Sequence, residues 1–132
     1  MCIRDRGMLI PTNGNPVEID IEVDETGSTL HDLQRLVGGN IESFDVIFGE
    51  GTSLYVNEEG LFTCPPNRAV YATKGMEEAG YLSMMDYSSP VKEGELYSIL
   101  CGDLVAVGFD FETGENRDLS ADEMSRVADY FT

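Results

Sequence analysis

The sequence contains few of the residues on which most catalytic and metal sites depend. It has 1 histidine, 3 cysteines and no tryptophan among its 132 residues. Because His31 is the only histidine, sites that need two of them, such as the H-E-x-x-H zinc motif, are excluded. No G-x-S-x-G motif is present, and the cysteines have no evident base near them. We therefore expect no metal, no cofactor, no catalytic residue and no enzymatic activity.

Basic residues are also scarce. Only 8 Lys and Arg oppose 25 Asp and Glu, which gives a formal net charge of −17. Such a chain repels phosphate backbones, whereas nucleic-acid-binding proteins carry a basic patch, so direct nucleic-acid binding is not expected. The sequence also lacks a secretory signal and an apolar run that could span a membrane. We expect a cytoplasmic protein in which Cys64 and Cys101 are free thiols; the alternative is one disulfide between them.

The first six residues, MCIRDR, look like the translation of a transposon adapter used in sequencing libraries. Segments of that kind are set aside in reasoning about a fold. We expect residues 1–7 to be an adapter-derived or disordered tail, a natural start near Met8, and a metagenomic source. Residues 8–132 then form a single domain. Without the three charged residues of the tail, 24 acidic and 6 basic residues remain, a net charge of −18.

Hydrophobic periodicity predicts a mixed fold. Residues 29–38 and 120–131 show helical spacing and begin at a Thr29 N-cap and a Ser120–Glu123 capping box. Strands are expected at residues 8–10, 17–24, 44–48, 54–56, 97–101 and 104–109. Residues 68–72 are read as one or two helical turns, and residues 75–95 as a loop with at most one short helix. The pattern indicates one α+β domain, with two firm helices packed on a mostly antiparallel sheet.

Residues 17–24 alternate between apolar and acidic side chains. The apolar ones are predicted to face the core, namely Val17, Ile19, Ile21 and Val23. The carboxylates should face water about 6.5 Å apart along the strand, and they are Glu18, Asp20, Glu22 and Asp24. Two interpretations stay open: a DNA-mimicking or protein-interaction face, or a solvated face that discourages edge aggregation.

The few basic residues suggest a ligand site. Two prolines precede Asn67 and Arg68, at the start of the short helix expected over residues 68–72. Helix N-termini attract anions, so a nucleotide-like ligand is predicted to bind here. The predicted contacts are Asn67, Arg68, Lys74, Tyr71, Tyr55, Gln34 and Arg35. The alternative is that Arg68 pairs with surface carboxylates.

Four segments carry a family resemblance: LHDLQRLVGGNIESFDV, SLYVNEEG, PPNRAV and SILCGDLVAVG. Together they resemble a phage- and mobile-element-associated family, domain of unknown function 3846, over about Met8 to Phe131. The resemblance implies a phage-type protein of an infected bacterial host and supplies no catalytic residues.

From the residues and the resemblance together, we expect a small acidic binding protein. Its predicted role is counter-defence, by sequestering a small nucleotide-like host signalling molecule, with a homo-oligomer completing the site. The alternative is an acidic interaction module or DNA mimic that inhibits a host DNA-binding protein through residues 17–24. An enzyme that uses an acidic pair is the third and least supported hypothesis.

Overall fold

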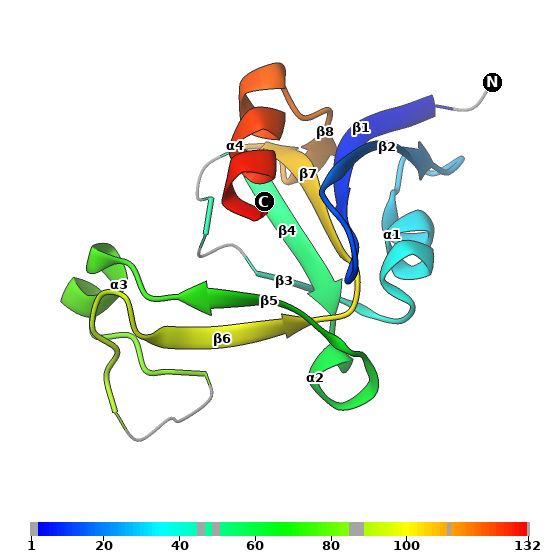
Figure 1. The fold of residues 1–132 in the computed structure, drawn as a ribbon. Helices are drawn as coiled ribbons and strands as arrows, with labels where there is room; N and C mark the ends of the chain where they lie inside the picture. Colours follow the sequence, from blue (N-terminus) through cyan, green and yellow to red (C-terminus); the bar gives the residue numbers. More distant parts are fainter. Residues whose placement is uncertain (1–2, 45–46, 49–50, 85–88, 111, 132) are drawn as a thin grey trace.

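The protein combines helices with two antiparallel sheets (Figure 1). The computed structural model describes residues 3–44, 47–48, 51–84, 89–110 and 112–131. The helices are α1 (Leu30–Val37), α2 (Gly60–Thr63), α3 (Lys74–Ala79) and α4 (Ala121–Phe131). The strands are β1 (Ile3–Ile10), β2 (Val17–Val23), β3 (Ile41–Ser43), β4 (Thr52–Asn57), β5 (Pro66–Tyr71), β6 (Leu96–Cys101), β7 (Leu104–Asp110) and β8 (Glu115–Arg117). The predicted α+β class with a mostly antiparallel sheet is confirmed.

Strand β7 is the centre of the larger sheet. The strand order is β2-β1-β7-β4-β3, and β8 also pairs with β7. Strand β1 pairs with the first part of β7, from Leu104 to Val107, and β8 pairs with its last part, from Gly108 to Asp110. The remaining strands, β5 and β6, form a separate two-stranded sheet that extends away from the larger one, with α3 beyond its far end (Figure 1).

The two long helices cover opposite faces of the larger sheet. Because strand side chains alternate, Val105 and Val107 point to one face and Leu104 and Ala106 to the other. The two valines belong to one apolar cluster with residues of α1, while Leu104 and Ala106 belong to another that includes residues of α4. All four side chains are 0% exposed, which explains why β7 reads as a continuous apolar run.

The predicted ends of both long helices are largely confirmed. Helix α1 stops at Gly38, whose φ of 79° is left-handed and whose N–H donates to the Gln34 carbonyl at 2.9 Å. Before α4, the Ser120 N–H donates to Glu123 Oε1 (2.9 Å), and the Glu123 N–H donates to Ser120 Oγ (3.2 Å). These reciprocal bonds are the capping box that the sequence predicts.

The predicted Thr29 cap is wrong. Its side chain makes no capping hydrogen bond, and Ser28 Oγ instead accepts from the Leu30 N–H at 3.1 Å. Thr29 Oγ1 accepts from Asn116 Nδ2 of β8 at 2.7 Å. The Thr29 hydroxyl, which a local cap would use, is therefore bonded to a residue 87 positions away in the sequence.

The first strand begins at Ile3 instead of near Met8. Residues 3–7, expected as a tail, pair with β2 throughout and belong to the sheet. Cross-strand ion pairs support this extension: Arg6 Nε lies 2.9 Å from Glu18 Oε1, and Arg4 lies 3.7 Å from Asp20. The adapter origin of this segment stays a prediction.

Two predicted elements are wrong. A strand is predicted at residues 44–48, but the strand in this part of the chain is β3, which ends at Ser43. Phe44 and Phe48 are buried in the core. The Phe44 N–H still donates to the Leu54 carbonyl of β4 at 2.7 Å, just beyond the end of β3, whereas Val46 lies outside the described residues. The helical turns expected at residues 68–72 are strand β5, in which Val70 is 0% and Tyr71 57% exposed. That alternation has the period of a strand.

Val17, which is predicted to face the core, is exposed, and so is Leu30 in the predicted helix over residues 29–38. Val17 is 47% exposed because it begins β2, the edge strand of the larger sheet, whereas Ile21 of the same strand is 0% exposed. Leu30 is 44% exposed in the first turn of α1, while Leu33 and Val37 are buried. The stretch 75–95 contains most of one short helix, α3, as expected, and residues 85–88 lie outside the described part of the chain.

Candidate functional site

The ligand contacts predicted from the sequence do not come together. Asn67 and Arg68 lie at the start of β5, whereas Tyr71 ends that strand and the exposed Lys74 begins α3. Gln34 and Arg35 lie on α1, and Tyr55 lies on β4. The predicted contacts are therefore distributed over four elements of the fold and do not form one site.

Asn67 and Arg68 hold three parts of the backbone together. Arg68 Nε donates to the Phe131 carbonyl (3.0 Å), and its Nη2 donates to the Gly14 carbonyl (2.9 Å). Asn67 Nδ2 donates to the carbonyls of Ile10 and Gly102, both at 2.8 Å. Arg68 Nη1 also donates to Asn67 Oδ1 at 2.7 Å. The guanidinium thus serves the C-terminal end of α4, where cations and donors are favoured.

Gln34 and Arg35 are used within and beside α1. Arg35 Nε donates to Asp32 Oδ1 at 2.7 Å, and Gln34 Nε2 donates to Asn40 Oδ1 at 3.3 Å. Asp32 is 6% exposed and also accepts from the Glu22 N–H at 2.8 Å. Burial raises the pKa of Asp32, but the hydrogen bonds from Arg35 and Glu22 outweigh burial and leave that pKa below its ordinary value.

The carboxylate row on β2 is partly neutralised. Glu18 and Asp20 are paired with arginines of β1, as described above. Asp24 Oδ1 accepts from Thr26 Oγ1 (2.6 Å) and from the Ser28 N–H (3.0 Å), and these bonds lower the pKa of Asp24. The row is therefore not a line of four unpaired charges, and its role as an interaction face stays a prediction.

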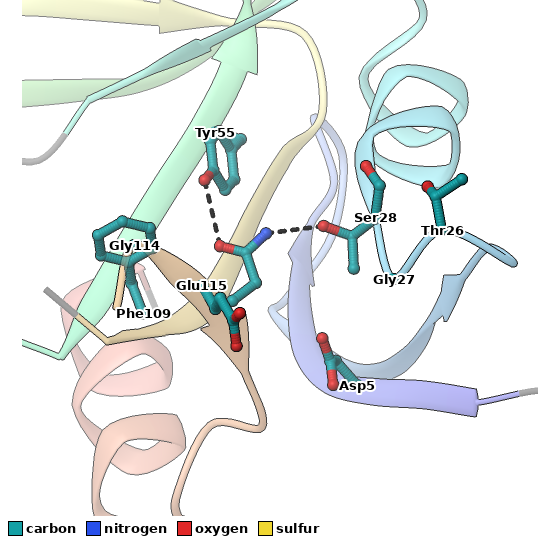
Figure 2. Close-up of a pocket in the computed structure, with 10 residues that line it drawn as sticks. Asp5, Thr26, Gly27, Ser28, Tyr55, Phe109, Gly114 and Glu115 are labelled. Atoms are coloured by element: carbon teal, nitrogen blue, oxygen red, sulfur yellow. Dashed lines mark hydrogen bonds between the residues drawn. The ribbon is translucent and has the colours of Figure 1, made fainter. Parts of the chain in front are cut away.

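A pocket of about 490 Å³ lies between the start of α1, strand β4 and the β7–β8 hairpin (Figure 2). We call it the α1–β8 pocket. Its lining residues are Asp5, Thr26, Gly27, Ser28, Thr29, Tyr55, Phe109, Gly114, Glu115 and Asn116. Tyr55 is the one residue here that the sequence singled out as a ligand contact.

Hydrogen bonds across the α1–β8 pocket join three elements. The Tyr55 hydroxyl of β4 donates to Asn116 Oδ1 of β8 at 3.3 Å, and Asn116 Nδ2 donates to Thr29 Oγ1 at 2.7 Å (Figure 2). The amide of Asn116 therefore links the hairpin both to the sheet and to the residue that precedes α1. This bridge fixes the orientation of polar groups that line the pocket.

The charged groups of the pocket are all acidic. Asp5 and Glu115 are carboxylates, and none of the lining residues that the structure describes is basic. Burial, together with the nearby negative charge of Asp118, raises the pKa of Asp5. The aromatic rings of Tyr55 and Phe109 also border the pocket, and ring faces attract cations. Such a lining favours a cationic or hydrogen-bonding ligand over an anion.

A smaller pocket of about 250 Å³ lies at the loop between β2 and α1. Its lining combines both signs of charge, from Glu22, Val23, Asp24, Ser28, His31, Asp32 and Arg35. Ser28 borders both pockets. His31, the single histidine, is exposed here, and the best-placed basic group, Arg35, is already bonded to Asp32.

In the described ranges of the chain, no three His, Cys, Asp or Glu side chains are arranged to hold a metal ion. Across the same ranges, no helix is both long enough and apolar enough to cross a membrane.

Comparison with known proteins identifies the family. The chain has no match among curated proteins or among solved structures. A family model described as a domain of unknown function matches residues 5–132, and so includes every lining residue of the α1–β8 pocket. The chain therefore belongs to the domain of unknown function family DUF3846.

Proposed function

We propose that this chain is a non-enzymatic binding protein that holds a small cationic ligand in the α1–β8 pocket. The observation that carries the proposal is the lining, which has Glu115 and two aromatic rings but no basic side chain among its described residues. Asp5 adds a second carboxylate, from the segment for which an adapter origin is predicted. A volume of about 490 Å³ lies in the ordinary range for sites that bind small molecules.

The acidic and aromatic groups of the lining favour an ammonium or guanidinium ligand. Asp5 and Glu115 supply negative charge, and a cation over the ring of Tyr55 or Phe109 gains about 0.5 to 2 kcal/mol. The hydroxyl and amide groups around Asn116 add hydrogen-bonding positions. At longer range, a net charge of −17 raises the local concentration of cations and speeds their arrival.

The wider hypothesis of counter-defence by sequestering a host signal stays part of this proposal, but the ligand class changes. A phosphorylated nucleotide in the pocket would meet Asp5 and Glu115 with no compensating cation in the lining. Arg68, the expected phosphate contact, donates its hydrogen bonds to carbonyl groups and to Asn67. A signal bound in the α1–β8 pocket is therefore expected to be cationic.

The proposal predicts that arginine amide binds the protein and that citrulline amide does not. Both amides are used with the α-amino group acetylated, so the guanidinium is the only charge of the arginine probe. The citrulline probe has nearly the same shape, but its ureido group leaves it neutral. Isothermal titration calorimetry at low salt measures both, with AMP as an anionic probe. Glu115→Gln should weaken arginine amide binding about tenfold, since it removes one charge at nearly constant shape. Glu112→Gln is the matched control, because Glu112 is exposed on the same hairpin and lies outside the lining.

Three results would contradict the proposal. They are equal binding of arginine and citrulline amides, tighter binding of AMP, and equal effects of Glu115→Gln and Glu112→Gln. Circular dichroism of both variants verifies that each one is folded.

A further inference from the structure

The two-stranded sheet has an apolar outer face. Cross-strand neighbours share a face, and Ala69 pairs with Ile99 while Tyr71 pairs with Leu96. Tyr71 is 57% and Leu96 37% exposed, Ala69 is exposed and Ile99 is half-buried. The opposite face is buried, as Val70 shows. We call Ala69, Tyr71, Leu96 and Ile99 the arm stripe.

Two further exposed apolar side chains lie on the segment that borders the start of β6, and the ring centroid of one of them, Tyr81, is 6.1 Å from that of the buried Tyr97. Ser83 Oγ donates to the Leu96 carbonyl (3.3 Å), so the segment around it runs beside the start of β6. This segment includes Tyr81 and Leu82, which are 41% and 43% exposed. Four of the seven large exposed hydrophobic side chains in the described chain therefore lie in this region. A contiguous apolar patch on a protein surface marks a contact site, and Tyr71 and Leu96 are the exposed large side chains that share the face of the arm stripe.

Charge is lowest in the same part of the chain. Residues 66–101, from β5 to β6, contain 5 acidic and 3 basic residues, a net charge of −2. The other 96 residues carry the remaining −15. A basic partner would be attracted to that more acidic part. Two copies of this chain repel each other least where the charge is lowest, so charge favours a second copy as the occupant of the stripe.

We propose that two copies of this chain associate through the arm stripe, which is buried between them. A two-fold contact uses the same patch on both copies, so the stripe itself meets the requirement for an identical partner surface. The proposal is independent of the ligand in the α1–β8 pocket, because no residue of the stripe lines that pocket. Unlike the homo-oligomer expected from the sequence, this dimer does not complete the ligand site.

Analytical ultracentrifugation of the full chain tests the proposal from micromolar to millimolar concentration. We expect a monomer–dimer equilibrium. Added sodium chloride should strengthen the dimer, because it screens the repulsion between two chains of charge −17. Tyr71→Glu should raise the dimer dissociation constant about tenfold or more, since it places a charge within the buried stripe.

Leu30→Glu is the matched control. Leu30 is 44% exposed on α1, away from the arm stripe, and the variant adds the same charge to the chain. It should leave the dissociation constant close to that of the parent. A chain that stays monomeric at every concentration and salt level would overturn the proposal, as would equal effects of Tyr71→Glu and Leu30→Glu. Circular dichroism confirms the fold of both variants, and Leu96→Glu repeats the test if Tyr71→Glu does not fold.

Discussion

Replacing Glu123 with alanine is expected to lower the free energy of unfolding by about 3 kcal/mol. Glu123 is 8% exposed and accepts hydrogen bonds from the Ser120 N–H at 2.9 Å and from Arg117 Nη1 at 2.8 Å. Thr52 Oγ1 of β4 also donates to it, at 3.3 Å. The variant removes the helix cap and leaves the partly buried Arg117 without this partner. Urea denaturation at neutral pH measures the loss, and a change below about 1 kcal/mol would contradict this role.

The same residue makes stability depend on pH. The hydrogen bond from Arg117 is the main cause that lowers the pKa of Glu123 from 4.5 to about 2. In the unfolded chain the carboxyl group takes up its proton near its ordinary pKa. Its stabilising contribution is therefore complete well above pH 4.5 and is lost as the pH falls toward 2.

Glu123→Gln is the matched control for the pH dependence. Glutamine keeps an oxygen that can accept from the Ser120 N–H, as in other capping boxes, but it does not titrate. The stability of the parent should therefore fall more steeply than that of Glu123→Gln as the pH is lowered through this range. Parallel curves for the two proteins would show that the Arg117–Glu123 pair does not contribute in the expected way.

Replacing Arg68 with alanine is expected to lower the free energy of unfolding by about 2 to 3 kcal/mol. The change removes the donors to the Phe131 carbonyl at 3.0 Å and to the Gly14 carbonyl at 2.9 Å. It also removes the donor to Asn67 Oδ1 at 2.7 Å. Chemical denaturation measures the effect, and the exposed Lys74 provides the control Lys74→Ala, which should change stability by less than about 0.5 kcal/mol.

Arg68→Ala also separates the structural role of Arg68 from the predicted nucleotide site. A folded variant should bind arginine amide as the parent does, because Arg68 does not line the α1–β8 pocket. The anion site predicted from the sequence would be favoured if the parent binds AMP and Arg68→Ala does not, while Arg68→Ala remains as stable as the parent.

Much of the fold could be predicted from local sequence. Helix α4 was placed correctly because its capping box and its apolar spacing agree, and α1 because Gly38 ends it. Strand β5 was missed because Pro65 and Pro66 suggested the start of a helix, whereas the alternation from Arg68 to Tyr71 was too short to decide. The segment is a strand because it pairs with β6, and β6 begins only at Leu96, far from β5 in the sequence.

Most of the candidate site could not be predicted from the sequence. Its lining comes from the β2–α1 loop, β4 and the β7–β8 hairpin, with Asp5 from β1. These segments meet only because β1 and β4 flank β7, and no local pattern specifies that strand order. Of the lining residues, only Tyr55 is predicted as a contact from the sequence, because an aromatic face can stack on a ligand. Asn116 gave no signal, since nothing near it in the sequence shows that it reaches Thr29.

The most direct test of the proposed function is an NMR titration of the isotope-labelled protein with arginine amide. Binding in the α1–β8 pocket predicts that the largest shift changes fall on the Asn116 side-chain amide and on backbone amides of Ser28, Thr29 and Gly114. Citrulline amide should leave these signals unchanged. The proposal would be contradicted if arginine amide shifted none of these signals, or if its largest changes fell around Arg68 and Lys74.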